Sequence, residues 1–254
     1  MLLAVDIGNT NIVIGLVHRN DGTVDIRRRL ATRSYRTADE WCMLLNQIIP
    51  PDQHSSVQGI IVSSVVPLLN DRMQEALSLL YGITPLFVSP NINLNISISS
   101  PNPDEIGADR IVNAAGAYAQ YHSACIIIDL GTATTFDIIN KHGEYLGGII
   151  LPGPELMRRA LHTFTAQLPE VDIAPPPAII GTNTITAMQS GLFNGLIGQI
   201  EYFIKHIKLE TAPDARVIAT GGLAASISTA TKVIDTTDID LTLFGLYTLY
   251  SLNT

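Results

Sequence analysis

Two aspartates that each follow a short apolar run are the residues of this sequence best suited to chemistry. The first is Asp6, which comes after the apolar residues 2–5 and just before Gly8 and Asn9. A glycine at this point lets a charged group approach the backbone, and the N–H groups of Gly8, Asn9 and Thr10 could bind a phosphate. Asp6 would then lie where a metal bound to that phosphate would be.

A second copy of the pattern occurs near the middle of the chain. Residues 126–139 read IIIDLGTATTFDII, so an apolar run again ends on an aspartate, Asp129, followed by Gly131 and Thr132. The first copy alone could equally be an ordinary hairpin with a polar tip. Two copies, almost half of the 254-residue chain apart, indicate an internal duplication of one phosphate-binding hairpin.

Hydrophobic periodicity predicts the elements that would position these hairpins. In the first half we expect strands at 2–5, 12–17, 23–31, 59–63 and 85–88, with helices at 37–49 and 67–81. Later we expect a helix at 106–121, strands at 126–129, 134–139, 145–151 and 217–219, and helices at 155–165, 185–207 and 241–252. Gly8 and Asn9 predict a two-residue turn in the first hairpin. The long segment 89–105, rich in Ser, Asn and Pro, is predicted to be a functional loop.

The bulk composition excludes several classes of protein. A hydrophobic content of 46% supports a sizeable core in one or two domains. A net charge of −8, with no basic cluster beyond residues 27–29, argues against a nucleic-acid partner. Cys42 and Cys125 lack a CxxC pattern or clustered histidines, so we expect reduced thiols in the core. Because no signal peptide or membrane-spanning run is evident, we expect a cytoplasmic protein without membrane contacts.

Six motifs, spread over nearly the whole chain, together resemble one family. They are DIGNTN at 6–11, NPDEIGADRIVN at 102–113, DLGTATTFD at 129–137, TAQLP at 165–169, GTNT at 181–184 and ATGGLA at 219–224. In this order they are similar to the type III pantothenate kinases, of the acetate and sugar kinase, Hsp70 and actin superfamily. The resemblance implies an α/β fold with two duplicated actin-like (ribonuclease H-like) lobes, at 1–115 and 116–254, and a nucleotide cleft between them.

The same resemblance implies an activity and its cofactors. The activity is ATP-dependent phosphorylation of pantothenate to 4′-phosphopantothenate, the first step of coenzyme A biosynthesis. Phosphoryl transfer requires mainly positioning and neutralised charge. The implied cofactors are Mg²⁺ with the ATP and a monovalent cation, K⁺ or NH₄⁺, held by Asp129. The implied ATP-binding residues are Asp6, Ile7, Gly8, Asn9, Thr10, Asn11, Ile12, Val13 and Thr132.

For the acceptor substrate, the resemblance implies that Asp109 accepts the proton of the reacting hydroxyl. Arg110 suits the carboxylate of pantothenate, because a guanidinium can offer it two parallel N–H bonds. The structural alternatives are a helix cap at Asp109 and a surface ion pair at Arg110. The implied pantothenate-binding residues are Gly107, Ala108, Asp109, Arg110 and Thr184.

Two positions depart from the family pattern. Ser100 stands where members commonly carry a tyrosine seven residues before the glycine of GADR, which puts one pantothenate contact in doubt. Thr182 stands where a lysine often follows the glycine of GTNT, and this change leaves Thr184 in place. The resemblance also implies a homodimer whose second chain helps to close the pantothenate pocket.

Glycines within the predicted helix at 185–207 bear on that homodimer. Gly191, Gly195 and Gly198 cost helix stability and often indicate close packing. They would give the helix a small-residue face for a second chain.

Two other functions remain open from the sequence. Another small-molecule phosphotransferase or phosphatase of the superfamily would keep both hairpins but lack GADR at 107–110. A non-catalytic nucleotide-binding regulator would be expected to lose Asp109 or a hairpin aspartate, and to have a basic surface if it met DNA. This sequence keeps GADR at 107–110 and all three of these aspartates, so it shows the signs of neither alternative. The six scattered histidines form no i,i+4 metal pair, and neither GxxxxGK[ST] nor GxGxxG is present.

Overall fold

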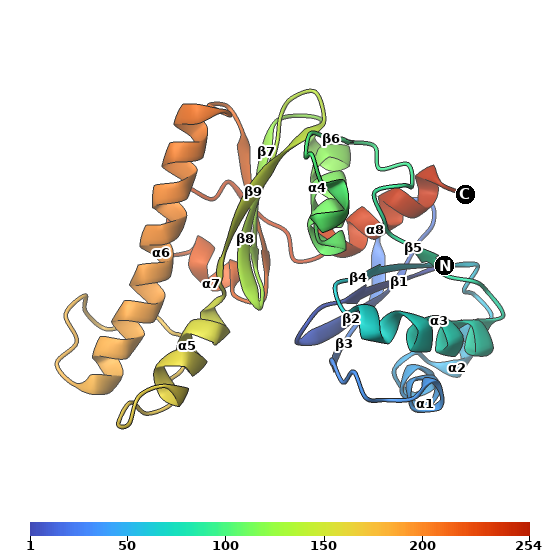
Figure 1. The fold of residues 1–254 in the computed structure, drawn as a ribbon, viewed down its shortest axis with the longest axis horizontal. Helices are drawn as coiled ribbons and strands as arrows, with labels where there is room; N and C mark the ends of the chain where they lie inside the picture. Colours follow the sequence, from blue (N-terminus) through green and yellow to red (C-terminus); the bar gives the residue numbers. More distant parts are fainter. The chain divides into compact units, whose positions relative to one another are not determined.

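The first unit of the structure is built on a five-stranded sheet. A computed structural model describes residues 1–254, and the chain divides into a unit of Met1–His122 with Asp240–Thr254 and a unit of Ser123–Ile239 (Figure 1). The order in the first sheet is β3-β2-β1-β4-β5. Its strands are β1 (Leu2–Ile7), β2 (Asn11–Val17), β3 (Val24–Ala31), β4 (Gly59–Ser64) and β5 (Leu86–Phe87). The helices of this unit are α1 (Ala38–Ile48), α2 (Pro51–His54), α3 (Pro67–Tyr81), α4 (Ala108–Tyr121) and α8 (Leu241–Leu252).

The second unit repeats this arrangement. Five of the six strands of the second sheet belong to this unit and follow the order β9-β8-β7-β10-β11. They are β7 (Cys125–Leu130), β8 (Ala133–Ile139), β9 (Glu144–Pro152), β10 (Arg216–Gly221) and β11 (Thr236–Thr237). Its helices are α5 (Pro154–Thr163), α6 (Thr184–Glu210) and α7 (Ala224–Ser228). These five strands match β3-β2-β1-β4-β5 of the first sheet one for one, which confirms the predicted duplication.

The match extends to single residues in the two hairpins. β1 and β7 have the same burial pattern, in which an aspartate is the one half-buried residue among buried ones. Asp6 pairs with Val13 on the antiparallel neighbour and with Ser63 on the parallel one. Asp129 occupies the equivalent position, between Thr135 and Thr220. The first hairpin differs from the prediction, because its strands are joined by three residues, 8–10, and not by two.

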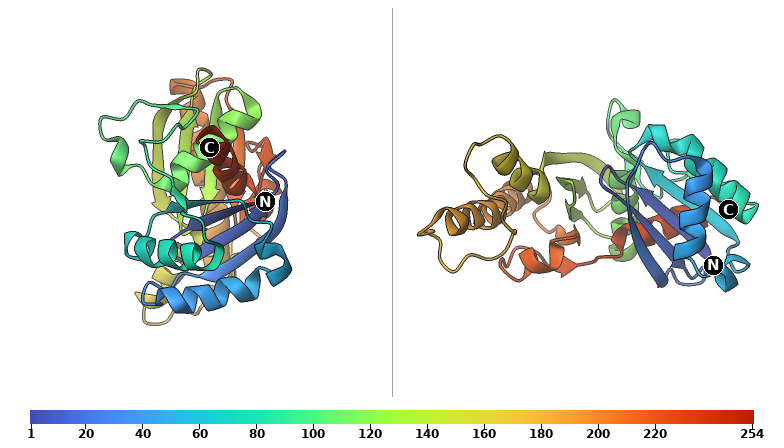
Figure 2. Two further views of the ribbon diagram at one scale, coloured as in Figure 1. Left: turned by 90° about the vertical axis from the view of Figure 1, so that its right-hand side faces the viewer. Right: turned by 90° about the horizontal axis from the view of Figure 1, so that it is seen from below.

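Helices cover both faces of the first sheet (Figure 2). On one face α1 and α3 contribute buried side chains, with Trp41 and Met73 fully enclosed. On the other face α4 and α8 pack through Ile111 and Leu246 against residues such as Ala4. This burial of apolar surface is the main stabilising contribution to the unit. It also fixes the strand ends, where the polar hairpin residues lie.

The C-terminal helix α8 belongs to the first unit, whereas the sequence placed it in the second lobe. It crosses α4 so closely that a Cβ on Gly245 would lie 2.2 Å from the carbonyl oxygen of Val112. A Cβ on Gly116 would lie 2.9 Å from the Cα of Gly245. The Thr242 hydroxyl also donates a hydrogen bond to Asn113 Oδ1, at 2.7 Å. The expected division after residue 115 therefore cuts through α4, and tight packing keeps α4 and α8 together.

Gly245→Ala should weaken the first unit strongly. The new methyl group has no room against Val112, and overpacking of this kind costs roughly 1–3 kcal/mol or more. Urea denaturation measures the change in the free energy of unfolding. Ser251→Ala, on the exposed side of the same helix, serves as the control and should change it by less than about 0.5 kcal/mol. An unchanged stability in Gly245→Ala would show that α4 and α8 do not depend on this close approach.

Other expectations have mixed outcomes. At Gly191, Gly195 and Gly198 of α6, an added Cβ atom would meet no other group of the chain within 4 Å, so these glycines mark no close packing inside this chain.

The 89–105 segment is mostly irregular, with a short strand β6 (Ser97–Ile98) and a single helical turn η1 (Pro103–Glu105). Both cysteines are free, and burial raises the pKa of the Cys125 thiol to about 11.

No helix in the structure has the length and apolar character that crossing a membrane requires.

Candidate functional site

The tip of the first hairpin is a short polar loop that is fixed by backbone and side-chain hydrogen bonds. The Gly8 N–H donates to the carbonyl oxygen of Asn11, at 3.0 Å, and so closes the turn. Thr32, just after β3, donates from its hydroxyl to the Gly8 carbonyl at 2.6 Å and from its N–H to the Thr10 carbonyl at 2.9 Å. Asn9, Thr10 and Asn11 are exposed. The sequence expected Gly8 to offer its N–H to a phosphate, but that group is already used within the turn.

The residues that flank this tip divide into core and surface positions. Ile7 and Ile12 are fully buried in the cluster beneath α1 and α3. Their side chains therefore stabilise the hairpin, and only their backbone groups could meet a nucleotide. Val13 is half-buried, on the same face of the sheet as Asp6.

The second expected site residue of this unit, Asp109, lies in the first turn of α4. Gly107 is the N-cap residue and has no side chain, so the cap makes no side-chain hydrogen bond. The Asp109 carboxylate instead accepts a hydrogen bond from the Arg110 N–H, at 2.8 Å. A Cβ on Gly107 would lie 2.6 Å from Asp109 Oδ1. A side chain at position 107 would therefore displace the carboxylate from this position.

The protein environment shifts the proton affinity of Asp109. Burial raises the pKa of its carboxyl above the usual range, and the N–H and positive charge of Arg110 oppose that shift. Desolvation makes a carboxylate a stronger base than it is in water. This property makes Asp109 a candidate general base.

Two contacts connect the start of α4 with the end of the first hairpin. The Val65 N–H, just after β4, donates to the Ile7 carbonyl at 3.0 Å. The Cγ1 atom of the same valine lies 3.4 Å from the point that a Cβ atom would occupy if Gly107 had one. The structure therefore brings the Asp109 turn to the same end of the first sheet as Asp6.

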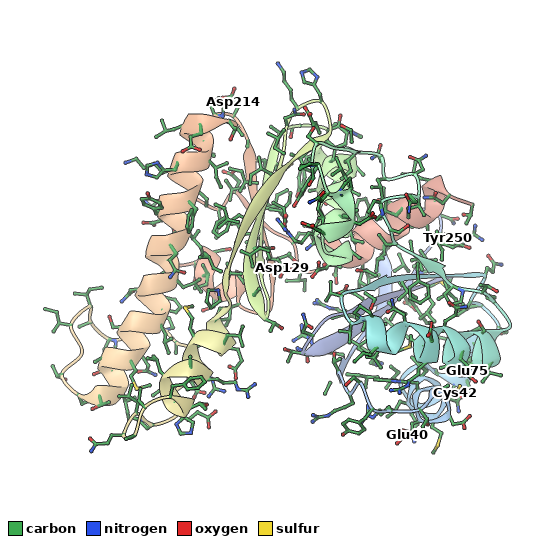
Figure 3. The ribbon with its side chains drawn as sticks, in the orientation of Figure 1. Glu40, Cys42, Glu75, Asp129, Asp214 and Tyr250 are labelled. Atoms are coloured by element: carbon green, nitrogen blue, oxygen red, sulfur yellow. The ribbon has the colours of Figure 1, made fainter.

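Two glycines from other elements, Gly221 and Gly153, lie close to the second hairpin. Gly221 has a positive φ of 93°, and a Cβ there would lie 2.7 Å from Asp129 Oδ1. A Cβ on Gly153 would lie 2.3 Å from the carbonyl oxygens of both Gly131 and Thr132. Gly153 also donates its N–H to the Thr132 carbonyl, at 3.0 Å. Figure 3 labels Asp129 at this end of the second sheet.

The carboxylate of Asp129 and the carbonyl groups of Gly131 and Thr132, which follow it in the same turn, carry hard oxygen atoms. A carboxylate with nearby carbonyl oxygens suits a weakly hydrated monovalent cation, whereas Mg²⁺ prefers an octahedral shell and usually keeps waters and phosphate ligands. No cluster of three or more His, Cys, Asp and Glu side chains that could hold a metal ion is present. The oxygen donors of this turn are thus of the chemical type that a monovalent cation accepts.

Thr184 is the first residue of α6, in the second unit. The preceding Asn183 caps the helix, because its side chain accepts a hydrogen bond from the Thr186 N–H at 2.9 Å. A Cβ on Gly181 would lie 2.2 Å from the Ala187 nitrogen, so this glycine is required by packing. Thr184 itself is exposed and takes no part in the cap, which leaves its hydroxyl for a ligand.

The 89–105 segment lines a cavity of about 480 Å³ in the first unit. Its lining residues are Pro90, Asn91, Ile92, Asn93, Leu94, Ile96, Ile98, Pro103 and Asp104. Ser100 is not among them, and its hydroxyl accepts a hydrogen bond from the Asn102 N–H at 3.2 Å. The serine at the usual tyrosine position thus contacts its own loop.

Sequence reasoning missed four residues that shape these sites. Thr32 and Ser63 carry no motif signal, since each is a single hydroxyl residue in or after a strand. Gly153 stands between two prolines, and its close approach to the second hairpin depends on tertiary structure. Gly221 lies in the ATGGLA motif, but its packing against Asp129 likewise depends on tertiary structure.

Comparison with known proteins gives one family and several similar structures. A family model described as type III pantothenate kinase matches residues 2–206. A Campylobacter jejuni protein assigned to the Baf family of transcriptional activators is 19% identical with a TM-score of 0.62, and the match covers 98% of this chain and 97% of that one.

Two further solved structures resemble the chain over nearly its whole length. A Sinorhizobium meliloti protein assigned as a 2-dehydro-3-deoxygalactonokinase is 15% identical, with a TM-score of 0.60 and coverage of 99% and 98%. A Listeria monocytogenes protein assigned as an N-acetylmannosamine kinase is 13% identical, with a TM-score of 0.53 and coverage of 99% of both chains. At such identities these likenesses establish the fold, of duplicated actin-like lobes, and not the substrate.

Proposed function

The chain belongs to the type III pantothenate kinase family, and on that premise we propose that it phosphorylates pantothenate with ATP to give 4′-phosphopantothenate. The observation that best supports this proposal is the environment of Asp109, a carboxylate of raised pKa in the Gly107–Arg110 turn beside the end of the first hairpin. A kinase for an alcohol needs such a base to orient the acceptor hydroxyl.

In this proposal the residues of the first unit prepare the acceptor. Asp109 accepts a hydrogen bond from the primary hydroxyl of pantothenate and takes its proton as the hydroxyl oxygen bonds to the γ-phosphorus, while the bond from that phosphorus to the bridging oxygen breaks and ADP leaves. Arg110 binds the carboxylate of pantothenate through its guanidinium, which fixes the distance from the carboxylate to the reacting hydroxyl. The exposed tip residues Asn9, Thr10 and Asn11 contact the phosphates of ATP.

The second unit contributes charge neutralisation. Asp129, with the carbonyl oxygens of Gly131 and Thr132, holds K⁺ or NH₄⁺, and Thr132 contacts the phosphates. Asp6 would bind the Mg²⁺ of ATP or one of its waters, and that ion would supply positive charge to the transferred group. Thr184 supplies a hydroxyl to pantothenate.

A coupled assay of ADP formation tests the proposal. ATP consumption should require pantothenate and should stay near background with acetate, glucose or N-acetylmannosamine as acceptor. Acceptor-independent or sugar-dependent turnover would instead favour another phosphotransferase of the superfamily. ATP binding without turnover on any acceptor would favour a nucleotide-binding regulator.

We extend the proposal to a homodimer in which α6 contacts a second copy. Gly191, Gly195 and Gly198 form an open small-residue face on α6, and the exposed Tyr202 and Leu209 continue along the helix. Small residues let two helices approach closely. In this arrangement Thr184, at the start of the same helix, would contribute to the partner's acceptor site.

Gly195→Trp should disrupt this dimer. The bulky side chain would separate the two helices, so light scattering at micromolar concentration should report a monomer with a near-native melting temperature and reduced turnover. Lys141→Trp, on an exposed turn of the same unit, is the control and should remain a dimer. A wild-type protein that is monomeric and fully active at that concentration would contradict the homodimer.

A further inference from the structure

The hydroxyl of Ser63 is a buried polar group whose position calls for an explanation. Ser63 lies near the end of β4, has 0% exposed surface, and its Oγ has no hydrogen-bond partner in the protein. A buried hydroxyl without a partner lowers stability, so such groups are rare unless something else requires them. The next residue, Ser64, has a local explanation, because its hydroxyl accepts a hydrogen bond from the Val66 N–H at the start of α3. Ser63 has none.

Ser63 is the direct neighbour of Asp6 across the parallel pairing of β1 and β4. Side chains alternate along a strand, and Ala4 and Ile61, each two residues earlier, both face the cluster beneath α4 and α8. Asp6 and Ser63 therefore lie on that same face. Adjacent strands lie about 4.8 Å apart, so a rotation of the serine side chain can bring its hydroxyl to the aspartate. Asp6 Oδ1 is itself buried.

The second unit repeats this pairing. Thr220 stands beside Asp129 at the position equivalent to Ser63, and only 2% of its surface is exposed. Neighbouring positions of the two hairpins differ in polarity. Thr135 of the second hairpin has Val13 as its equivalent in the first, and Asp137 has Gly15. A buried hydroxyl therefore accompanies the aspartate in both copies of the hairpin.

We propose that Ser63 is a positioning residue for Asp6. When Asp6 binds the Mg²⁺ of Mg·ATP, or a water of that ion, the Ser63 hydroxyl donates a hydrogen bond to Asp6 Oδ1. The second carboxylate oxygen is then held toward the ligand. Groups that orient a metal-binding side chain in this way typically contribute about 10- to 100-fold to metal affinity or activity. The inference rests on the proposed function, since it requires a nucleotide site at the first hairpin.

The test measures binding directly and does not depend on pantothenate. Titration calorimetry gives the affinity for an unreactive ATP analogue with and without Mg²⁺, and thermal melting gives the stability without ligand. Ser63→Ala should reduce the Mg²⁺-dependent part of the affinity by about 10- to 100-fold. Its melting temperature should not fall, because the lost hydroxyl had no partner. Ser63→Thr, which keeps the hydroxyl as Thr220 does, should restore most of the affinity.

Thr134→Val is the matched control. Thr134 is also fully buried, and its hydroxyl also has no hydrogen-bond partner. It lies on β8 opposite Leu130, on the same face of the second sheet as Phe136, whereas Asp129 lies on the other face. It should bind the analogue as the wild type does. Unchanged Mg²⁺-dependent binding in Ser63→Ala, or a clear loss of melting temperature, would overturn the inference while leaving the proposed function intact. Failure of the wild type to bind the analogue at all would overturn both.

Discussion

Asp109→Asn is expected to give a folded protein that binds ATP and pantothenate but turns over at least about 10²-fold more slowly. The asparagine keeps the shape of the side chain and an oxygen that can accept the Arg110 N–H. It cannot accept a proton from the substrate hydroxyl. Steady-state kinetics give kcat, and calorimetry with each substrate separates binding from turnover.

The stability of this variant provides a second, independent result. Because burial raises the pKa of Asp109 in the folded state, the charged carboxylate destabilises the protein at pH values above that raised pKa. Asp109→Asn should therefore be at least as stable as the wild type near neutral pH. The difference should shrink as the pH falls through the raised pKa toward the ordinary value, because the wild-type carboxyl then becomes neutral. Urea denaturation at several pH values measures this dependence.

Asp104→Asn is the control for Asp109→Asn. It removes an exposed carboxylate just before the same helix and should leave kcat nearly unchanged. If Asp109→Asn retained near-normal turnover and only melted at a lower temperature, Asp109 would be a helix cap. The base would then have to be sought elsewhere, with Asp6 as the next candidate.

Asp129→Ala is expected to abolish the dependence of turnover on K⁺ or NH₄⁺ and most of the turnover itself. The wild type should require one of these ions even with saturating Mg²⁺ and ATP, because in the proposal the Asp129 carboxylate and the carbonyl oxygens of Gly131 and Thr132 supply the hard oxygen ligands that a monovalent ion takes. Turnover measured over a series of K⁺ concentrations, at constant ionic strength, tests this expectation.

The control for that variant is Asp214→Ala, an exposed carboxylate of the same unit. It should keep both the rate and the K⁺ dependence of the wild type. Equal turnover of the wild type in buffer that contains only sodium would contradict a K⁺ site at Asp129.

Regular elements and the duplication could be predicted from the sequence because they depend on local patterns. The apolar runs before Asp6 and Asp129 and the amphipathic helices give periodic signals, and the structure has strands and helices at those places. The short strand β11 and the turn η1 carry too few residues for a periodic signal. Their positions depend on pairing and packing across the chain.

Close approaches between distant residues could not be predicted. Gly153, Gly221 and Gly245 are required because backbone or side chains from other elements occupy the space of a Cβ. No local pattern distinguishes them from Gly191 or Gly195, which face open space. The same limit explains why the sequence placed α8 in the second lobe, since its packing against α4 depends on such a contact.

Mass spectrometry of the reaction product tests the central proposal most directly. Wild-type protein incubated with Mg·ATP, K⁺ and pantothenate should yield pantothenate that carries one added phosphoryl group, on its primary hydroxyl as located by ³¹P–¹H NMR. The Asp109→Asn protein, at the same concentration and time, should yield only a trace. Unmodified pantothenate in the wild-type reaction, with ATP bound or consumed on another acceptor, would contradict the proposed function.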